Sequence, residues 1–165
     1  MLSYNLVRKL FLSFFILFVF CRFLSAEERG SCIKLENRWL QIHHTHVELW
    51  SRAQRQEVMA LAAVYLNCKQ SAQQKFDVLM SGARAAYGEG KRVDVGYFLK
   101  EAHKFLPVLS ENDAAMWHRL KGNAAWVENK KFDAAWHYAQ AFTRFDYLKS
   151  HYEKAAISLS MALVW

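Results

Sequence analysis

The densest group of side chains able to bind a metal is the run His43-His44-Thr45-His46. On a helix, His43 and His46 are three residues apart and share one face. Two imidazoles are too few, because a structural zinc site takes four ligands and a catalytic one takes three. The chain also lacks the His-Glu-x-x-His sequence of zinc hydrolases. We therefore expect no metal site and no cofactor. A compact helical protein that binds metal or haem through His43, His44 and His46 is the alternative.

The common catalytic signatures are missing from the sequence. It contains no Gly-x-Ser-x-Gly nucleophile turn, no phosphate-binding Walker loop and no dinucleotide-binding glycine fingerprint. Carboxylates near each other in the chain, such as Asp94 and Glu101, support acid–base chemistry only if a cleft surrounds them. We therefore expect no catalytic residues and no enzymatic activity. An enzyme whose groups converge only in the folded chain is a second alternative.

The composition favours a folded, helical protein. Of the 165 residues, 53% are hydrophobic and 22% charged, which excludes a disordered chain. One proline and six glycines leave little turn chemistry for a many-stranded sheet. The sequence therefore predicts an all-α fold.

The N-terminal segment has the order of a signal peptide. Arg8 and Lys9 precede an apolar run over residues 10–21, and small residues then end at Ala26. The run is shorter than the roughly 20 apolar residues of a membrane-spanning helix. We expect cleavage after Ala26 and export to the periplasm or the extracellular space. Arg22 is unusual so close to a cleavage site, so an uncleaved membrane anchor is the alternative.

Removing that segment takes away Arg8, Lys9 and Arg22, so 22 basic residues become 19 against 15 acidic ones, a net charge of +4. The remaining charges of both signs are interspersed. Because a nucleic-acid-binding surface needs clustered basic residues, we expect no nucleic-acid partner. Membrane contact is expected only if the N-terminal segment is retained.

Two cysteines remain in the exported chain, Cys32 and Cys68. Oxidising compartments permit disulfides. We expect a disulfide that joins the N-terminal extension to the first long helix; two buried free thiols are the alternative. No Cys-x-x-Cys pair indicates a zinc finger or a redox site.

Apolar residues recur at three- and four-residue intervals along the rest of the chain, the period of a helix. Breaks fall at Gly88-Glu89-Gly90 and Pro107, and Ser110 with Asp113 has the form of an N-terminal cap. These signals predict helices over 39–67, 71–87, 93–105, 113–128, 131–144 and 147–163.

Two segments have a shared pattern of small and large residues. In 76–109 the pattern is carried by Ala83, Gly90, Leu99, Ala102 and Pro107. In 115–148 it is carried by Gly122, Ala134, Tyr138 and Ala141. Both segments resemble the tetratricopeptide repeat, a helix-turn-helix of about 34 residues. They depart from it in Val95, which replaces an alanine, and in the extra residues 110–114.

The resemblance implies antiparallel helix pairs stacked as a short tetratricopeptide-like solenoid. Residues 1–26 are then the signal peptide, 27–75 an N-terminal helical extension, and 76–165 two repeats followed by a capping helix.

In that family the exposed face of each first helix lines a groove that binds a peptide or protein. The resemblance thus predicts an exported adaptor or scaffold whose partner has an acidic group. The implied groove residues are Met80, Arg84, Tyr87, Arg119, Asn123 and Trp126.

Overall fold

The structure, a computed structural model, describes residues 30–42, 49–68, 70–147 and 151–164. The regular structure in these ranges is entirely helical, which confirms the predicted all-α class. None of the described helices is long and apolar enough to cross a membrane. A first helix covers residues 30–42. It is followed by α2 (Arg52–Tyr65), α3 (Ala72–Gly88), α4 (Arg92–His103), the short 3₁₀ helix η2 (Leu106–Val108), α5 (Glu111–Val127), α6 (Lys131–Tyr147) and α7 (His151–Val164).

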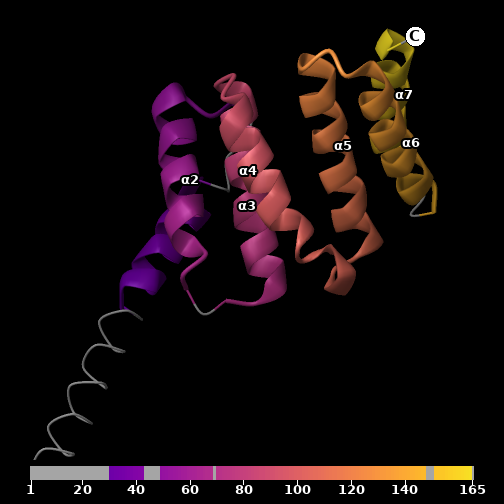
Figure 1. Cartoon of the computed structure of the whole chain (residues 1–165). Coiled ribbons are helices and arrows are strands. Elements are labelled where there is room, and N and C mark those ends of the chain that lie inside the picture. The colour runs from indigo at the N-terminus through magenta and orange to yellow at the C-terminus, as the bar shows by residue number, and fades with distance from the viewer. Residues whose placement is uncertain (1–29, 43–48, 69, 148–150, 165) are drawn as a thin grey trace, which may run out of the picture.

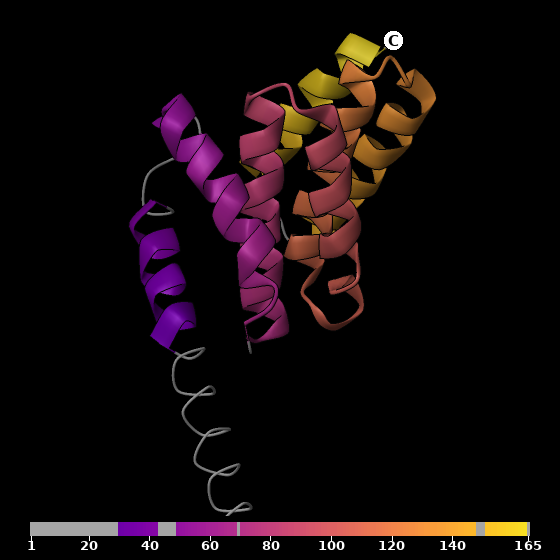
Figure 2. The same ribbon diagram turned by 60° about the vertical axis from the view of Figure 1, so that its left-hand side comes forward.

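Each helix from α2 to α7 packs mainly against its neighbours in the sequence (Figures 1 and 2). The buried side chains form two clusters. The first is built from the helix over 30–42 and from α2, α3 and α4, with Trp117 and Leu120 of α5. The second joins α5, α6 and α7 around Tyr138, Phe145 and Ile157. Helix α5 therefore contributes to both cores.

Serine caps fix where α2, α3 and α5 start. Ser51, Ser71 and Ser110 each begin a capping box, in which the serine side chain and that of the third helical residue bond each other's backbone N–H. The cap predicted at Ser110 is confirmed. The prediction of a single helix over 39–67 is wrong. Trp50 is not helical, and Ser51 is the N-terminal cap of a separate helix, α2. Helical spacing of apolar residues continues across this break, so the period alone does not reveal it.

The turns after α3 and α5 have the same hydrogen bonds. Glu89, Gly90 and Lys91 donate their backbone N–H groups to the carbonyls of Ala85, Tyr87 and Ala86; Glu128, Asn129 and Lys130 donate to Ala124, Trp126 and Ala125. Every residue of the second turn lies 39 positions after its counterpart (128 − 89 = 39). Gly90 (φ 68°) and Asn129 (φ 60°) take the left-handed conformation that ends a helix. The turns that join α3 to α4 and α5 to α6 thus have the same geometry, with an offset of 39 residues.

Glycines allow the closest helix contacts. A Cβ atom on Gly122 would lie 2.6 Å from Cε1 of Tyr138, which is closer than carbon atoms approach. Gly82 of α3 is in a similar place: a Cβ atom added there would lie 2.9 Å from Cβ of Ala62 and 3.1 Å from the Phe98 ring. The sequence pattern assigned the small-residue role in this helix to Ala83, which is fully buried. The tightest contact is made one residue earlier, by Gly82.

Replacing Gly122 by alanine should lower the free energy of unfolding by about 1–2 kcal/mol. Overpacking costs about 1–3 kcal/mol, and the better helix propensity of alanine returns up to about 1 kcal/mol. Urea denaturation of the purified protein measures the change. The matched control is Gly96→Ala in α4, where nothing lies within 4 Å of the new methyl group, so stability should rise. Equal stabilisation by both substitutions would show that Tyr138 does not press on Gly122.

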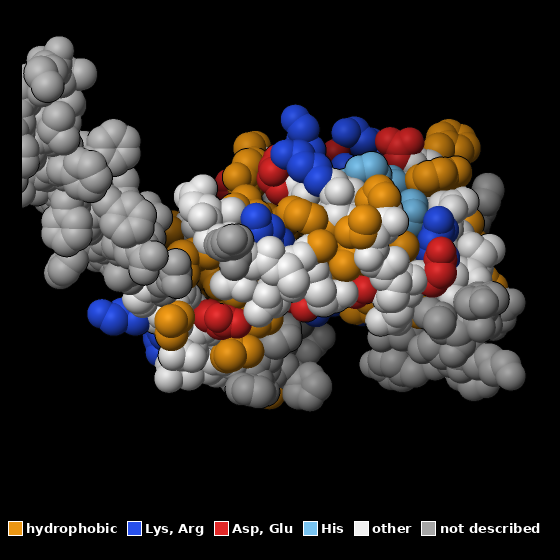
Figure 3. Space-filling view, turned by 90° about the horizontal axis from the view of Figure 1, so that it is seen from below, with side chains coloured by type: hydrophobic (Ala, Val, Ile, Leu, Met, Phe, Trp, Pro, Cys, Tyr) orange, Lys and Arg blue, Asp and Glu red, His pale blue; other side chains and the backbone are white. Residues whose placement is uncertain are grey.

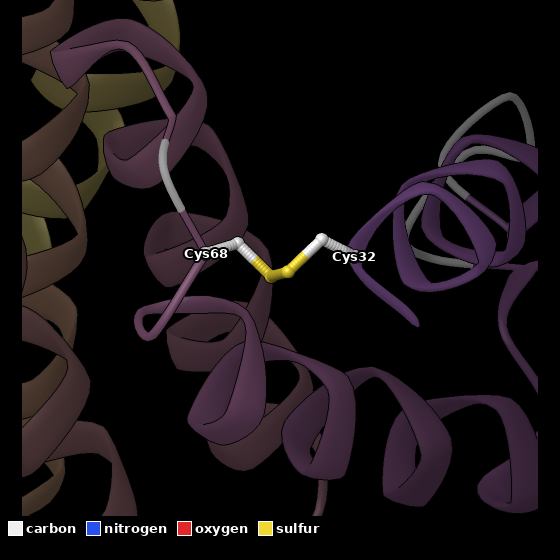
Figure 4. Close-up of a disulfide and its surroundings, with 2 residues drawn as sticks. All are labelled: Cys32 and Cys68. Carbon is white, nitrogen blue, oxygen red and sulfur yellow. A yellow bond between two sulfur atoms is a disulfide. The ribbon is translucent and has the colours of Figure 1, made fainter. Parts of the chain in front are cut away.

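The first helix is attached to the rest of the chain by covalent and polar contacts. Cys32 and Cys68 form a disulfide with their Cα atoms 5.8 Å apart, which confirms the predicted pairing (Figure 4). Arg38 bonds both carboxylate oxygens of Glu57 in α2, at 2.5 and 2.8 Å. The indole N–H of Trp50 donates to the carbonyl of Ile42. The disulfide therefore joins a helix that side chains also hold in place.

Candidate functional site

Four of the six predicted groove residues are half-buried: Arg84, Arg119, Asn123 and Trp126. Tyr87 is 38% exposed. Met80 is only 4% exposed and belongs to the first core cluster, so its assignment to a binding surface is corrected. Met80 was assigned to the groove from its place in the tetratricopeptide pattern, but in the structure its side chain faces the core.

Tyr138 of α6 brings three helices together. Its hydroxyl donates to Oδ1 of Asn123 at 2.9 Å. The pKa of the Tyr138 phenol is raised to about 12, mainly by burial and also by the nearby Tyr87 phenol. A hydrogen bond with Ser160 and the positive charge of Arg119 lower the same pKa. Side chains of α3, α5 and α7 therefore all act on this one hydroxyl.

A cavity of about 220 Å³ lies beside Tyr87, between the α3–α4 turn and the C-terminal end of α5. Its lining is mostly apolar, with one cation and one anion at the rim. The lining residues are Tyr87, Gly90, Arg92, Val95, Ala124, Val127 and Glu128. Such a cavity accepts an apolar side chain better than a charged one.

The remaining predicted residues have contacts within the chain. Trp126 packs against the second core cluster, and Nζ of Lys131 lies 6.0 Å from the centre of its ring, within range of a cation–π contact. Arg84 and Arg119 also interact with other groups of the protein. A ligand at this face would therefore exchange contacts with these side chains as well as add to them.

Sequence reasoning missed a cluster of histidine and tryptophan rings between α4, α5 and α6. Nδ1 of His118 lies 3.0 Å from Nδ1 of His137, and Trp117 and Trp136 present ring edges to these imidazoles. The Trp117 ring also makes a tilted contact with the His103 ring, at 5.0 Å between centroids, and its indole N–H donates to the carbonyl of Leu99 at 2.9 Å. Figure 3 shows histidine side chains gathered along one edge of the molecule, among basic, acidic and hydrophobic side chains.

Both imidazoles of the pair are neutral at pH 7. Burial is the main cause that lowers the pKa of each to about 4; Arg144 adds to the effect at His118, and Lys121 at His137. At 3.0 Å, one Nδ1 must donate a proton and the other accept it. No sequence signal connects these two histidines, because they are 19 positions apart and meet only through packing of α5 on α6.

Within the described residues, no group of three or more histidine, cysteine, aspartate or glutamate side chains is placed to hold a metal ion. The run His43, His44 and His46, on which the metal- or haem-binding alternative depends, lies outside the described residues. The segment 1–26, for which the sequence predicts a signal peptide, lies outside them too.

No family model, curated protein or solved structure matches this chain. Two features of the folded chain therefore bear on its function: the predicted groove residues near Tyr138 with the adjoining cavity, and the largely buried histidine cluster.

Proposed function

We propose that this chain is an exported, non-enzymatic adaptor or scaffold that binds a peptide or protein partner. Its helix pairs are stacked as a short tetratricopeptide-like solenoid, with α7 as a terminal half-repeat. The recurrence of the α3–α4 turn hydrogen bonds in the α5–α6 turn, 39 residues later, supports this arrangement. A repeat array of this kind presents equivalent positions of successive hairpins on one continuous surface.

The observation that carries the proposal is the convergence on the Tyr138 hydroxyl. Tyr87 of α3, Arg119 and Asn123 of α5 and Ser160 of α7 all bond to it or influence its pKa. These residues come from the first helices of successive pairs, which line the groove of a tetratricopeptide solenoid. Five of the six residues implied by the resemblance remain assigned to the groove, without Met80.

The chemistry of this face favours a segment with both an acidic and an apolar group. Arg84 and Arg119 carry guanidinium groups that form forked, charge-assisted hydrogen bonds with carboxylates. The cavity beside Tyr87 accepts an apolar side chain of the same segment. The favoured partner is therefore an extended or helical segment with an acidic residue close to an apolar one.

Export is part of the proposal, and the Cys32–Cys68 disulfide supports it. Disulfides persist in oxidising compartments such as the periplasm and the extracellular space, and are rare in the reducing cytosol. The order of basic, apolar and small residues up to Ala26 supports it independently.

Arg119→Ala and Trp126→Ala should each weaken partner binding by about 1–3 kcal/mol, because each removes a charged or aromatic contact at the centre of the face. The partner is first captured with tagged protein expressed in its native exported compartment. Affinities of the purified pair are then measured by calorimetry, with circular dichroism to show that helical content is unchanged.

Lys100→Ala and Val108→Ala serve as controls, since both side chains are exposed and lie outside the groove residues. They should leave the affinity unchanged. An unchanged affinity in the Arg119→Ala/Trp126→Ala double variant would exclude this face as the binding site.

A further inference from the structure

A second surface motif occurs twice in the chain with the same offset of 39 residues. It begins with two basic residues, continues with an apolar residue and an aspartate, and ends with an aromatic residue three positions later. The first copy is Lys91-Arg92-Val93-Asp94 with Tyr97, and the second is Lys130-Lys131-Phe132-Asp133 with Trp136. The copies occupy the first turns of α4 and α6.

The apolar members of both copies are exposed, although the Trp136 ring also contacts the imidazoles of His118 and His137. Val93 is 86% exposed and its counterpart Phe132 is 87% exposed; Tyr97 is 47% and Trp136 is 56% exposed. Two residues after each aromatic, the chain turns inward to the buried pair Leu99 and Tyr138. The motif therefore recurs on the outside of each hairpin without being required by the core.

The two copies lie at the same end of the molecule. Figure 1 shows α4 and α6 both beginning at the upper end of the view. Each copy follows one of the two equivalent turns, so the basic pairs and the exposed apolar side chains have the same place in each hairpin. Four protruding apolar side chains, flanked by four basic ones, thus occupy one end of the helical array.

Much of the negative charge at this end is paired inside the chain. Glu89 binds Arg55 at 2.6 Å and Arg52 at 3.3 Å, and Glu128 binds Lys130 at 2.6 Å. Six basic residues (Arg52, Arg55, Lys91, Arg92, Lys130 and Lys131) then stand against four acidic ones (Glu89, Asp94, Glu128 and Asp133), a local charge of +2. The end is therefore complementary to a negatively charged surface.

We propose that this doubled motif docks the protein on a membrane that carries anionic lipid. Val93 and Phe132, the most exposed members, enter the boundary between headgroups and acyl chains. Tyr97 and Trp136 lie at headgroup level, where amphipathic rings are most stable. Lys91, Arg92 and Lys131 contact lipid phosphates, whereas Lys130 pairs with Glu128. This contact needs no membrane-spanning segment.

A lipid surface fits the motif better than a folded partner does. Single side chains that project from a helix end need a matching pocket in a protein, whereas a fluid bilayer closes around them. The surface adjoins the groove residues, since Arg92 also lines the cavity beside Tyr87 and Lys131 lies over the Trp126 ring. Val93 and Phe132 belong neither to the groove residues nor to the cavity lining, so substitutions at these two positions separate membrane docking from partner binding.

Quenching of Trp136 by brominated lipid tests the docking. The full chain is mixed with vesicles of equal parts phosphatidylcholine and phosphatidylglycerol, with or without bromine on the acyl chains. Bromine should quench part of the tryptophan fluorescence of the wild-type protein, and Trp136→Phe should abolish that part. Pure phosphatidylcholine vesicles and added salt should both reduce the quenching, because the basic pairs then contribute less.

The double variant Val93→Ser/Phe132→Ser should bind the vesicles at least about tenfold more weakly, as measured by the same quenching. The reason is that two large apolar side chains no longer transfer from water into the lipid. Val108→Ser is the matched control: it removes a side chain that is 74% exposed in η2, outside the motif, and should change nothing. All variants keep the N-terminal segment, so any membrane contact of that segment is common to them.

Equal quenching in wild-type protein and Trp136→Phe would overturn the proposal, as would quenching that survives Val93→Ser/Phe132→Ser. If that double variant loses a captured protein partner and vesicles never quench Trp136, the motif is a protein interface and membrane docking is wrong.

Discussion

Loss of the Cys32–Cys68 disulfide should lower the free energy of unfolding by about 4 kcal/mol. The bond closes a loop between residues 36 positions apart, and a loop of that length restricts the unfolded chain by roughly this amount. The folded state changes little, because Trp39, Ile42 and the Arg38–Glu57 pair still hold the first helix on α2.

Urea denaturation of the native protein and of Cys32→Ser/Cys68→Ala measures this effect; alanine at 68 avoids placing a hydroxyl at a position that is only 4% exposed. Mass analysis without reductant should show the native protein two hydrogens lighter than its reduced form. Free alkylation of both thiols in native protein would contradict the disulfide, and equal stability of the two proteins would contradict its contribution.

Acidification from pH 6.5 to about pH 4 should remove on the order of 3 kcal/mol of stability through His118 alone. Its pKa is about 4 in the folded chain and 6.5 ordinarily, and each pH unit between them is worth about 1.4 kcal/mol. In that interval His118 is protonated in the unfolded chain but not in the folded chain, so the free energy of unfolding falls as the pH falls. His137 acts in the same direction.

The interval from pH 6.5 to pH 4.5 isolates the histidines. The pKa values of Glu57, Glu89 and Glu128 are lowered from 4.5 by hydrogen bonds with Arg38, Arg55 and Lys130, so their contribution is lost only below that pH. Thermal denaturation across the interval should show a clear decline for the native protein and a smaller one for His118→Phe. Equal slopes would show that the buried pair is not neutral in the folded state.

Local signals in the sequence were enough to predict most of the helices. Gly88-Glu89-Gly90, Pro107 and the Ser110 cap each fix a break through backbone chemistry that depends only on neighbouring residues. The helix break at Trp50 was missed although it too has a local signal. Ser51 and Gln54 form a capping box there, but apolar spacing continues on both sides and conceals it.

The candidate sites depend on packing between helices, which spacing reports only in part. Of the predicted groove residues, Tyr87, Arg119 and Asn123 all interact with the Tyr138 hydroxyl. The repeat pattern misplaced Met80, since a small rotation of α3 decides whether that position faces solvent or core. No local signal joins His118 to His137, because their contact exists only once α5 lies against α6.

The exposure of the doubled motif could not be predicted from the sequence alone. Val93 and Phe132 look like core residues when each is considered by itself. Their exposure is a property of the folded chain, in which each follows one of two turns with the same hydrogen bonds, 39 residues apart.

Helix α5 contributes side chains to both hydrophobic cores. Trp117 and Leu120 face the first cluster, and Ala115 and Ala125 face the second. Neither cluster can open without exposing one side of this helix, so α5 transmits cooperativity between halves that otherwise touch little. The covalent bond, however, lies in the first half alone. Hydrogen exchange should therefore begin at the α7 end and reach α2 last, with α5 as the boundary between the two cooperative units.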